Sequence, residues 1–139
     1  MRIAIDTNIL VAALAHPSGT SADIVNAWVD GRMEVVASEA TIREAELVLG
    51  GGWLARMASF EAVESLLEAL RTRSVLSEEP TSIADLRLKD AGDLRLVEAA
   101  VAGGARYVVT TDREFLRQRG YAGVEFVTPS EFVRVMKED

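Results

Sequence analysis

The stretch Arg2-Ile3-Ala4-Ile5-Asp6 places a short apolar run, partly β-branched, directly before an acid. Such a run is typical of a strand buried on both faces of a parallel sheet. Comparable runs recur at 34–37, 106–110 and 124–127. The first strand therefore has candidate partners further along the chain, and Asp6 stands at its carboxyl end.

Apolar residues at helical spacing lie between these runs. They predict helices over 21–29, 39–49, 61–70, 94–102 and 130–136. Turn-forming residues such as Gly50-Gly51-Gly52 separate the pieces. This alternation of strands and helices predicts an α/β fold, a three-layer α/β/α domain with a central parallel sheet. The polar, irregular stretch 77–89 is expected to loop across the surface.

Length and composition limit the class of protein. With 139 residues we expect a single domain spanning 1–139. The apolar runs fall short of the roughly 20 residues that a membrane span needs, and an acid interrupts the N-terminal run before a signal-peptide core can form. We therefore expect a soluble, cytoplasmic protein with no membrane association.

The available side chains narrow the chemistry. The chain has no cysteine and one histidine, so thiolate metal sites, disulfides and thiol nucleophiles are excluded. A metal site has to be rich in carboxylates, which suit hard ions such as Mg²⁺ or Mn²⁺. The net charge of -7 leaves two readings open. The acids form an ordinary solvated surface, or several converge on a site where bound cations reverse the local field.

Several acids stand where a parallel sheet binds ligands, at the carboxyl ends of strands. Asp6 ends the first strand, Asp112 follows the run 106–110, and Asp93 opens a helix just after Asp90. Each has a simpler explanation as a helix N-cap, a position that Asp favours. Taken singly, these acids are ambiguous.

Glu44 is a fourth acid of interest. On a helix its neighbours at i−4, i+3 and i+4 are Ala40, Leu47 and Val48, so it lies within an apolar stripe. An unpaired buried carboxylate is costly, and a metal ion relieves that cost. The alternative is a glutamate at the edge of the stripe whose carboxylate reaches water. A cluster of four acids suits metal-assisted hydrolysis of a phosphodiester.

The order of motifs resembles the PIN-domain family over nearly the whole chain. The matching segments are 5–10, 38–49 around Glu44, Asp90-Ala91-Gly92-Asp93 before an alanine-rich helix, 109–116 around Asp112, and 127–132. The resemblance places the family's acidic cluster on Asp6, Glu44, Asp93 and Asp112, as catalytic and metal-binding residues. It makes Asn8, Asp90 and Thr110 candidates for supporting side chains around them. Thr111 departs from the glycine that related sequences often have.

The resemblance implies an endoribonuclease that depends on Mg²⁺ or Mn²⁺ and hydrolyses RNA. Many small prokaryotic PIN proteins are VapC-like toxins held inactive by a cognate antitoxin, and they commonly form homodimers. Arg113 and Arg117, spaced i, i+4, are candidates for gripping RNA phosphates. A solvated basic face paired with Glu114 explains them equally well.

Three other functions compete. A haloacid dehalogenase-like phosphatase needs a second Asp where Asn8 stands, and a receiver domain needs an early acidic pair and a late-strand lysine that this chain lacks. A catalytically silent PIN-like module that binds RNA or a protein remains the alternative, because fold does not guarantee activity.

The apolar helices also predict self-association. Their surfaces carry more apolar area than one core is expected to hide. The residues expected at the contact are Ile24, Trp28, Leu66, Leu67 and Leu70.

Overall fold

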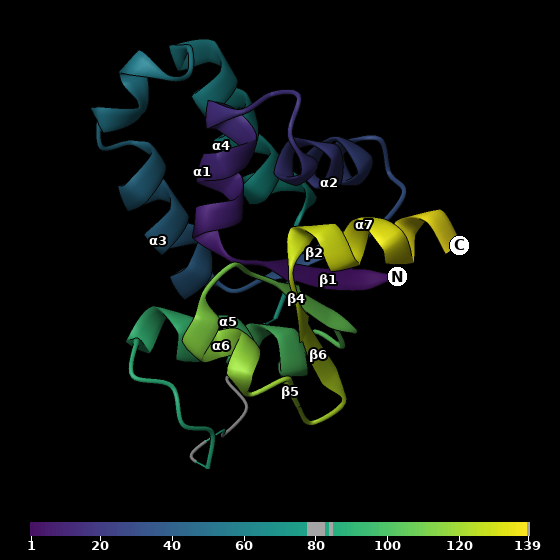
Figure 1. Ribbon diagram of the computed structural model, residues 1–139. Helices are drawn as coiled ribbons and strands as arrows, with labels where there is room; N and C mark the ends of the chain where they lie inside the picture. The colour runs from purple at the N-terminus through teal and green to yellow at the C-terminus, as the bar shows by residue number, and fades with distance from the viewer. Residues whose placement is uncertain (78–82, 84, 139) are drawn as a thin grey trace.

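The computed structural model describes residues 1–77, 83 and 85–138. These residues form a six-stranded sheet in the order β3-β2-β1-β4-β6-β5 (Figure 1). Neighbouring strands are parallel except β5 and β6, which are antiparallel. The strands are β1 (Arg2–Ile5), β2 (Glu34–Ala37), β3 (Val75–Leu76), β4 (Tyr107–Val109), β5 (Gly120–Tyr121) and β6 (Val124–Val127).

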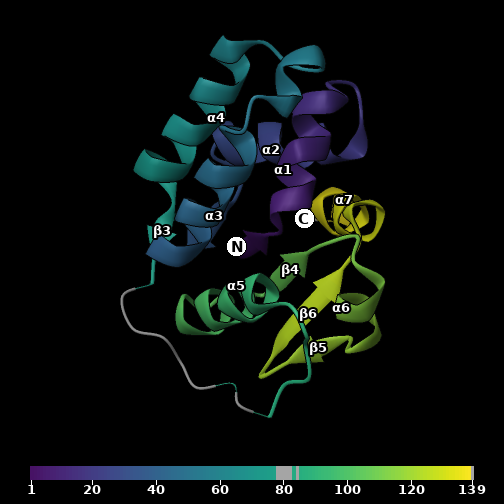
Figure 2. The ribbon, with the colours of Figure 1, turned by 90° about the vertical axis from the view of Figure 1, so that its left-hand side faces the viewer.

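Helices cover both faces of the sheet, as Figures 1 and 2 show. On one side lie α1 (Thr7–Ala15), α2 (Thr20–Val29), α3 (Glu39–Leu49), the short 3₁₀ helix η1 (Trp53–Arg56), α4 (Phe60–Arg73) and α7 (Pro129–Glu138). On the other side lie α5 (Ala91–Ala102) and α6 (Arg113–Arg117). The expected α/β fold with a central, mostly parallel sheet is confirmed.

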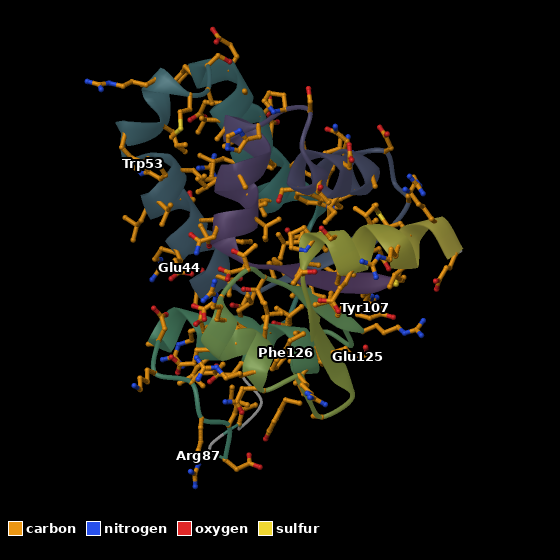
Figure 3. All side chains as sticks on the ribbon, in the orientation of Figure 1. Glu44, Trp53, Arg87, Tyr107, Glu125 and Phe126 are labelled. Carbon is orange, nitrogen blue, oxygen red and sulfur yellow. The ribbon has the colours of Figure 1, made fainter. Side chains whose placement is uncertain are left out.

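Side chains that alternate along the strands build two cores. Ile3 and Ile5 of β1 pack in the core beneath α1, α2, α4 and α7, whereas Ala4 packs in the core beneath α5 and α6. Tyr107 on the first side meets Phe132 of α7 edge to face, with ring centroids 5.7 Å apart. Figure 3 labels Tyr107 and, on β6, Phe126, which belongs to the second core. Burial on both faces explains the consecutive apolar residues of these strands, such as Ile3-Ala4-Ile5 in β1.

The strand order reverses beside β1. From β1 the chain moves outward to β2 and β3, then returns to the other side of β1 with β4 and β6. Ile5 and Val109 are register partners, and the backbone N–H of Asp6 donates to the carbonyl of Val109 at 3.0 Å. The carboxyl ends of β1 and β4 therefore meet at the point where such sheets bind ligands.

The prediction of which residues mediate self-association is wrong. Ile24, Trp28, Leu66, Leu67 and Leu70 are all buried in the first core, because α2 and α4 turn these residues toward the sheet and α1. Four of the seven large apolar side chains that are exposed among the described residues lie instead between α3 and the start of α4. They are Leu47, Trp53, Met57 and Phe60.

The irregular stretch 77–89 falls partly outside the described residues, which omit 78–82 and 84. Its described residues contain no helix or strand. Ile83 and Leu88 are buried in the second core, so this part is anchored more firmly than its polarity predicts. Within 1–77, 83 and 85–138, no helix has the length and apolar character to cross a membrane.

Candidate active site

Asp6 lies buried at the carboxyl end of β1, with 8% of its surface exposed. Its Oδ2 accepts a hydrogen bond of 2.7 Å from the hydroxyl of Thr110, which is fully buried just past β4. The same Thr110 oxygen accepts the backbone N–H of Asp112 at 3.1 Å. Thr110 therefore connects the acids that follow the two central strands.

Asp6 occupies the N-cap position of α1, and its backbone carbonyl accepts the amide of Ile9 at 2.9 Å. Its side chain makes no capping hydrogen bond there. Burial raises the pKa of Asp6, while the hydroxyl of Thr110 and the nearby amide of Asn8 favour the charged form and the charge of Asp112 opposes it. The side-chain hydrogen bond that Asp6 makes goes to Thr110 rather than to the start of α1, so capping alone does not account for this carboxylate.

Asp112 and Asp90 are the acids whose side chains cap helices, α6 and α5 respectively. Oδ1 of Asp112 accepts the amides of Glu114 and Phe115 at 2.9 and 3.2 Å, which starts α6. Oδ1 of Asp90 accepts the amides of Gly92 and Asp93 at 2.7 and 3.2 Å, which starts α5. Because Asp90 caps α5, the carboxylate of Asp93 has no capping role.

Asp93 is the most perturbed acid of the cluster. Its pKa is raised to about 7, first by burial and then by the charges of Asp6, Asp90, Asp112 and Glu44. All four charged groups that raise this pKa are acids, so Asp93 lies within electrostatic reach of the other acids. The basic residue closest in sequence, Arg95, pairs with Glu98 of α5 at 3.3 Å instead.

The raised pKa predicts how the metal-free protein responds to pH. Folded Asp93 binds its proton more tightly than the unfolded chain does, so stability falls as pH rises from about 4 to about 7. Solvent screening reduces the effect to about 1 kcal/mol, or about 4 °C in melting temperature. Thermal melts in a chelator against pH measure it. Asp93→Asn is the control. If the stability of that variant falls with pH as steeply as that of wild type, Asp93 is not the group responsible.

Glu44 reaches the cluster from α3. Its Oε2 lies 3.5 Å from the hydroxyl of Thr7, the residue after Asp6. A Cβ atom at Gly92 of α5 would stand 2.2 Å from Oε1 of Glu44, so the absent side chain at Gly92 leaves the room for this carboxylate. Burial, then the charges of Asp90 and Asp6, raises the pKa of Glu44.

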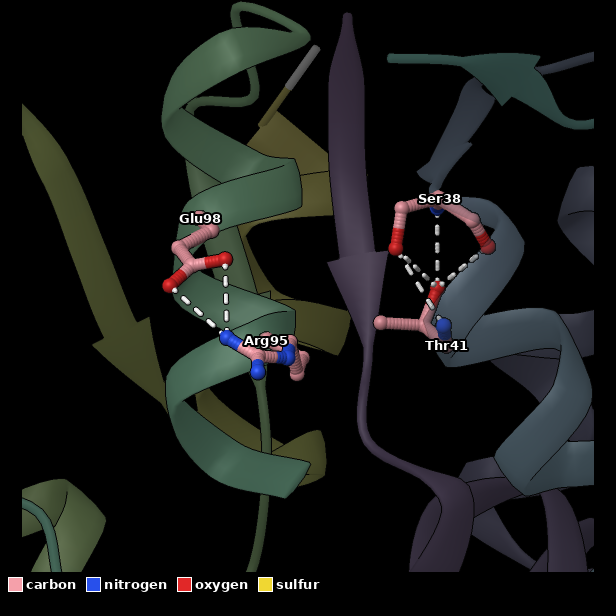
Figure 4. Close-up of polar contacts among 4 residues, drawn as sticks. All are labelled: Ser38, Thr41, Arg95 and Glu98. Atoms are coloured by element: carbon pink, nitrogen blue, oxygen red, sulfur yellow. Dashed lines mark hydrogen bonds and ion pairs between the residues drawn. The ribbon is translucent and has the colours of Figure 1, made fainter. Parts of the chain in front are cut away.

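The prediction that Glu44 lies within a packed apolar stripe is wrong. The helix buries Ala45 and Leu49, whereas Leu47 is 74% exposed and Glu44 itself is exposed. Glu44 therefore lies on the flank of α3 that faces α5 rather than on its packed face. Figure 4 draws α5 and the start of α3 on either side of β1, with the Ser38–Thr41 capping contact at the start of α3 and the Arg95–Glu98 pair on α5.

The acids fit a divalent ion by their chemistry. They are carboxylates that raise one another's pKa, and such oxygen donors suit Mg²⁺ or Mn²⁺. In the part of the chain that the structure describes, however, no three acidic or histidine side chains are close enough to hold a metal ion together. That all four acids share metal ions stays a prediction.

The remaining residues singled out from the sequence lie at the edges of this region. Asn8 is exposed on the first turn of α1, and Arg113 and Arg117 are exposed on α6. Within the described ranges neither arginine forms a salt bridge, and Glu114 contacts the amide of Lys89 rather than a basic face. Sequence reasoning missed the parts played by Thr7 and Gly92, although both lie inside quoted motifs.

The fold and the site define the class of the protein: a doubly wound α/β domain with carboxylates gathered at its switch point. A family model described as PIN domain matches residues 2–114, and the chain belongs to the PIN-domain family. This confirms the resemblance seen in the sequence. PIN domains are in general nucleases that use divalent metal ions.

Solved structures share the fold. VapBC2 from Rickettsia felis, bound to a promoter DNA fragment, is 18% identical, covers 92% of this chain and 98% of its own, and has a TM-score of 0.57. PAE2754 from Pyrobaculum aerophilum is 18% identical over 100% and 91% of the chains, with a TM-score of 0.62. FitAcB from Neisseria gonorrhoeae is 20% identical over 92% and 98%, with a TM-score of 0.52. No curated protein matches the chain in sequence.

Proposed function

We propose that residues 1–139 act as one PIN-like nuclease domain that hydrolyses RNA phosphodiester bonds internally and depends on Mg²⁺ or Mn²⁺. The observation that carries the proposal is that Asp6 and Asp112 follow the two central strands at the switch point, while burial and the charges of Asp6, Asp90, Asp112 and Glu44 raise the pKa of Asp93. Asp6, Glu44, Asp93 and Asp112 would hold the metal. A bound divalent ion supplies an oriented water and stabilises the charge that develops on the phosphoryl group.

The chain's own residues prepare this chemistry. Thr110 fixes the orientation of Asp6, and the backbone of Asp112 fixes Thr110. Thr7 orients Glu44 across the gap between α1 and α3. Arg113 and Arg117 are exposed beside Asp112 and carry positive charge for RNA phosphates on an otherwise acidic chain.

One observation favours the alternative, a catalytically silent module that binds RNA or a protein. The described acids do not bring three ligands together as they stand. Cleavage assays separate the two functions. We expect purified protein to cut single-stranded RNA with Mn²⁺ or Mg²⁺, with no cleavage in a chelator. Absence of metal-dependent cleavage on RNA and on single-stranded DNA supports the silent module, and cleavage of DNA alone overturns the substrate.

We also propose a cytoplasmic toxin with a cognate antitoxin and a homodimeric state. The support is the family together with two neighbours of similar fold, VapBC2 and FitAcB. The exposed side chains Leu47, Trp53, Met57 and Phe60 offer apolar area for a contact. Growth arrest on expression that a neighbouring gene relieves tests the toxin role, and sedimentation showing only monomer at micromolar concentration contradicts the dimer.

A further inference from the structure

We propose that Glu114 is a positioning residue that ties the acids of α5 to the acid of α6. Its Oε1 accepts the backbone N–H of Lys89 at 3.2 Å. Lys89 immediately precedes Asp90, and Glu114 lies two residues after Asp112. The inference rests on the proposed function to the extent that these acids form the metal site.

A chain of hydrogen bonds runs from Asp6 to Glu114. Thr110 donates to Asp6 at 2.7 Å, the amide of Asp112 donates to Thr110 at 3.1 Å, and the amide of Glu114 donates to Asp112 at 2.9 Å. This part of the network orients the acids that follow β1 and β4. It ends at the Glu114 backbone.

The carboxylate of Glu114 extends the network to α5. Beyond Lys89, Asp90 accepts the amides of Gly92 and Asp93 and so fixes the first turn that carries Asp93. Among the residues that the structure describes, no other hydrogen bond joins 89–93 to 110–114. Glu114 therefore connects two parts of the site that have separate places in the sequence.

The segment before Asp90 has further contacts that do not involve Glu114. Tyr121 Oη donates to Asp85, and Gln118 Nε2 donates to the carbonyl of Arg87 at 3.3 Å. The side chain of Arg87 points away from the body of the protein (Figure 3). Leu88 is buried in the second core. Loss of the Glu114 contact is thus expected to loosen the turn at 89–93 without undocking the segment or unfolding the domain.

A positioning role is distinguishable from a simple effect of charge. Glu114→Ala removes both the charge and the acceptor, whereas Glu114→Gln removes the charge and keeps an oxygen that accepts the Lys89 amide. Glu64→Ala removes one charge from an exposed position on α4 and is the matched control. The readouts are Mn²⁺ affinity by calorimetry and hydrogen exchange at the amide of Lys89.

We expect Glu114→Ala to weaken Mn²⁺ binding about tenfold, the size of effect seen for groups that orient metal ligands. Glu114→Gln and Glu64→Ala should stay within about threefold of wild type. Exchange at Lys89 should accelerate in the alanine variant alone. Wild-type behaviour of Glu114→Ala, or an equal loss in Glu114→Gln, overturns the positioning role. If wild-type protein binds no Mn²⁺, the proposed function fails, and exchange at Lys89 still decides whether Glu114 holds the turn.

Discussion

Replacing Asp6 by Asn is expected to abolish metal-dependent cleavage of RNA and to leave the metal-free protein as stable as wild type or more stable. Asn keeps the shape of the side chain and an oxygen that accepts the Thr110 hydroxyl, but it removes the charge that binds the ion. Loss of a residue that merely supports a ligand costs about 10- to 100-fold, so we expect a loss of at least about 100-fold here. Burial already disfavours the charged form of Asp6, which is why the neutral variant should fold well.

The measurement combines cleavage of single-stranded RNA with thermal melts in the presence and absence of Mn²⁺. Wild type should gain melting temperature with Mn²⁺, because the ion binds the folded state, and the variant should lose most of that gain. Asp23→Asn on the exposed side of α2 is the matched control. Retained cleavage together with an unchanged Mn²⁺ response in Asp6→Asn contradicts the catalytic role of Asp6.

The parallel sheet could be predicted because its central strands are buried on both faces. Ile3, Ala4 and Ile5 face two different cores, so the run contains no polar residue to break the pattern. The two-residue strands β3 and β5 are too short to show any periodicity. The bounds of helix α1 do not follow from the sequence, because residues 9–15 are all apolar and therefore define no single face.

The sequence predicts which residues belong to the candidate site more readily than it predicts the role of each. The sequence predicts an N-cap role for both Asp90 and Asp93. The structure shows that Asp90 caps α5, so the carboxylate of Asp93 has no capping role. For Glu44, helical spacing predicts a buried stripe, but the neighbouring Leu47 is 74% exposed. Spacing along one helix does not reveal which face another element covers.

Gly92→Ala is expected to weaken Mn²⁺ binding about tenfold while changing the stability of the metal-free fold little. The added Cβ would stand 2.2 Å from Oε1 of Glu44 and 2.9 Å from Oδ1 of Asp90. Asp90 is held by capping bonds as short as 2.7 Å, whereas Glu44 is exposed and its contact with Thr7 is long at 3.5 Å, so Glu44 is the side chain that turns away. Alanine also favours the helix over glycine by up to about 1 kcal/mol, which offsets the crowding.

A double-mutant cycle with Glu44→Ala decides whether the glycine acts through Glu44. Glu44→Ala removes both the proposed ligand and the atom that the new methyl group meets. Adding Gly92→Ala to that background should therefore cause no further loss of Mn²⁺ affinity, which makes the two effects strongly non-additive. Calorimetric Mn²⁺ titration of the four proteins, with metal-free melts to confirm folding, measures the cycle. A tenfold loss that persists in the Glu44→Ala background shows that Gly92 matters for another reason, such as the cap at Asp90.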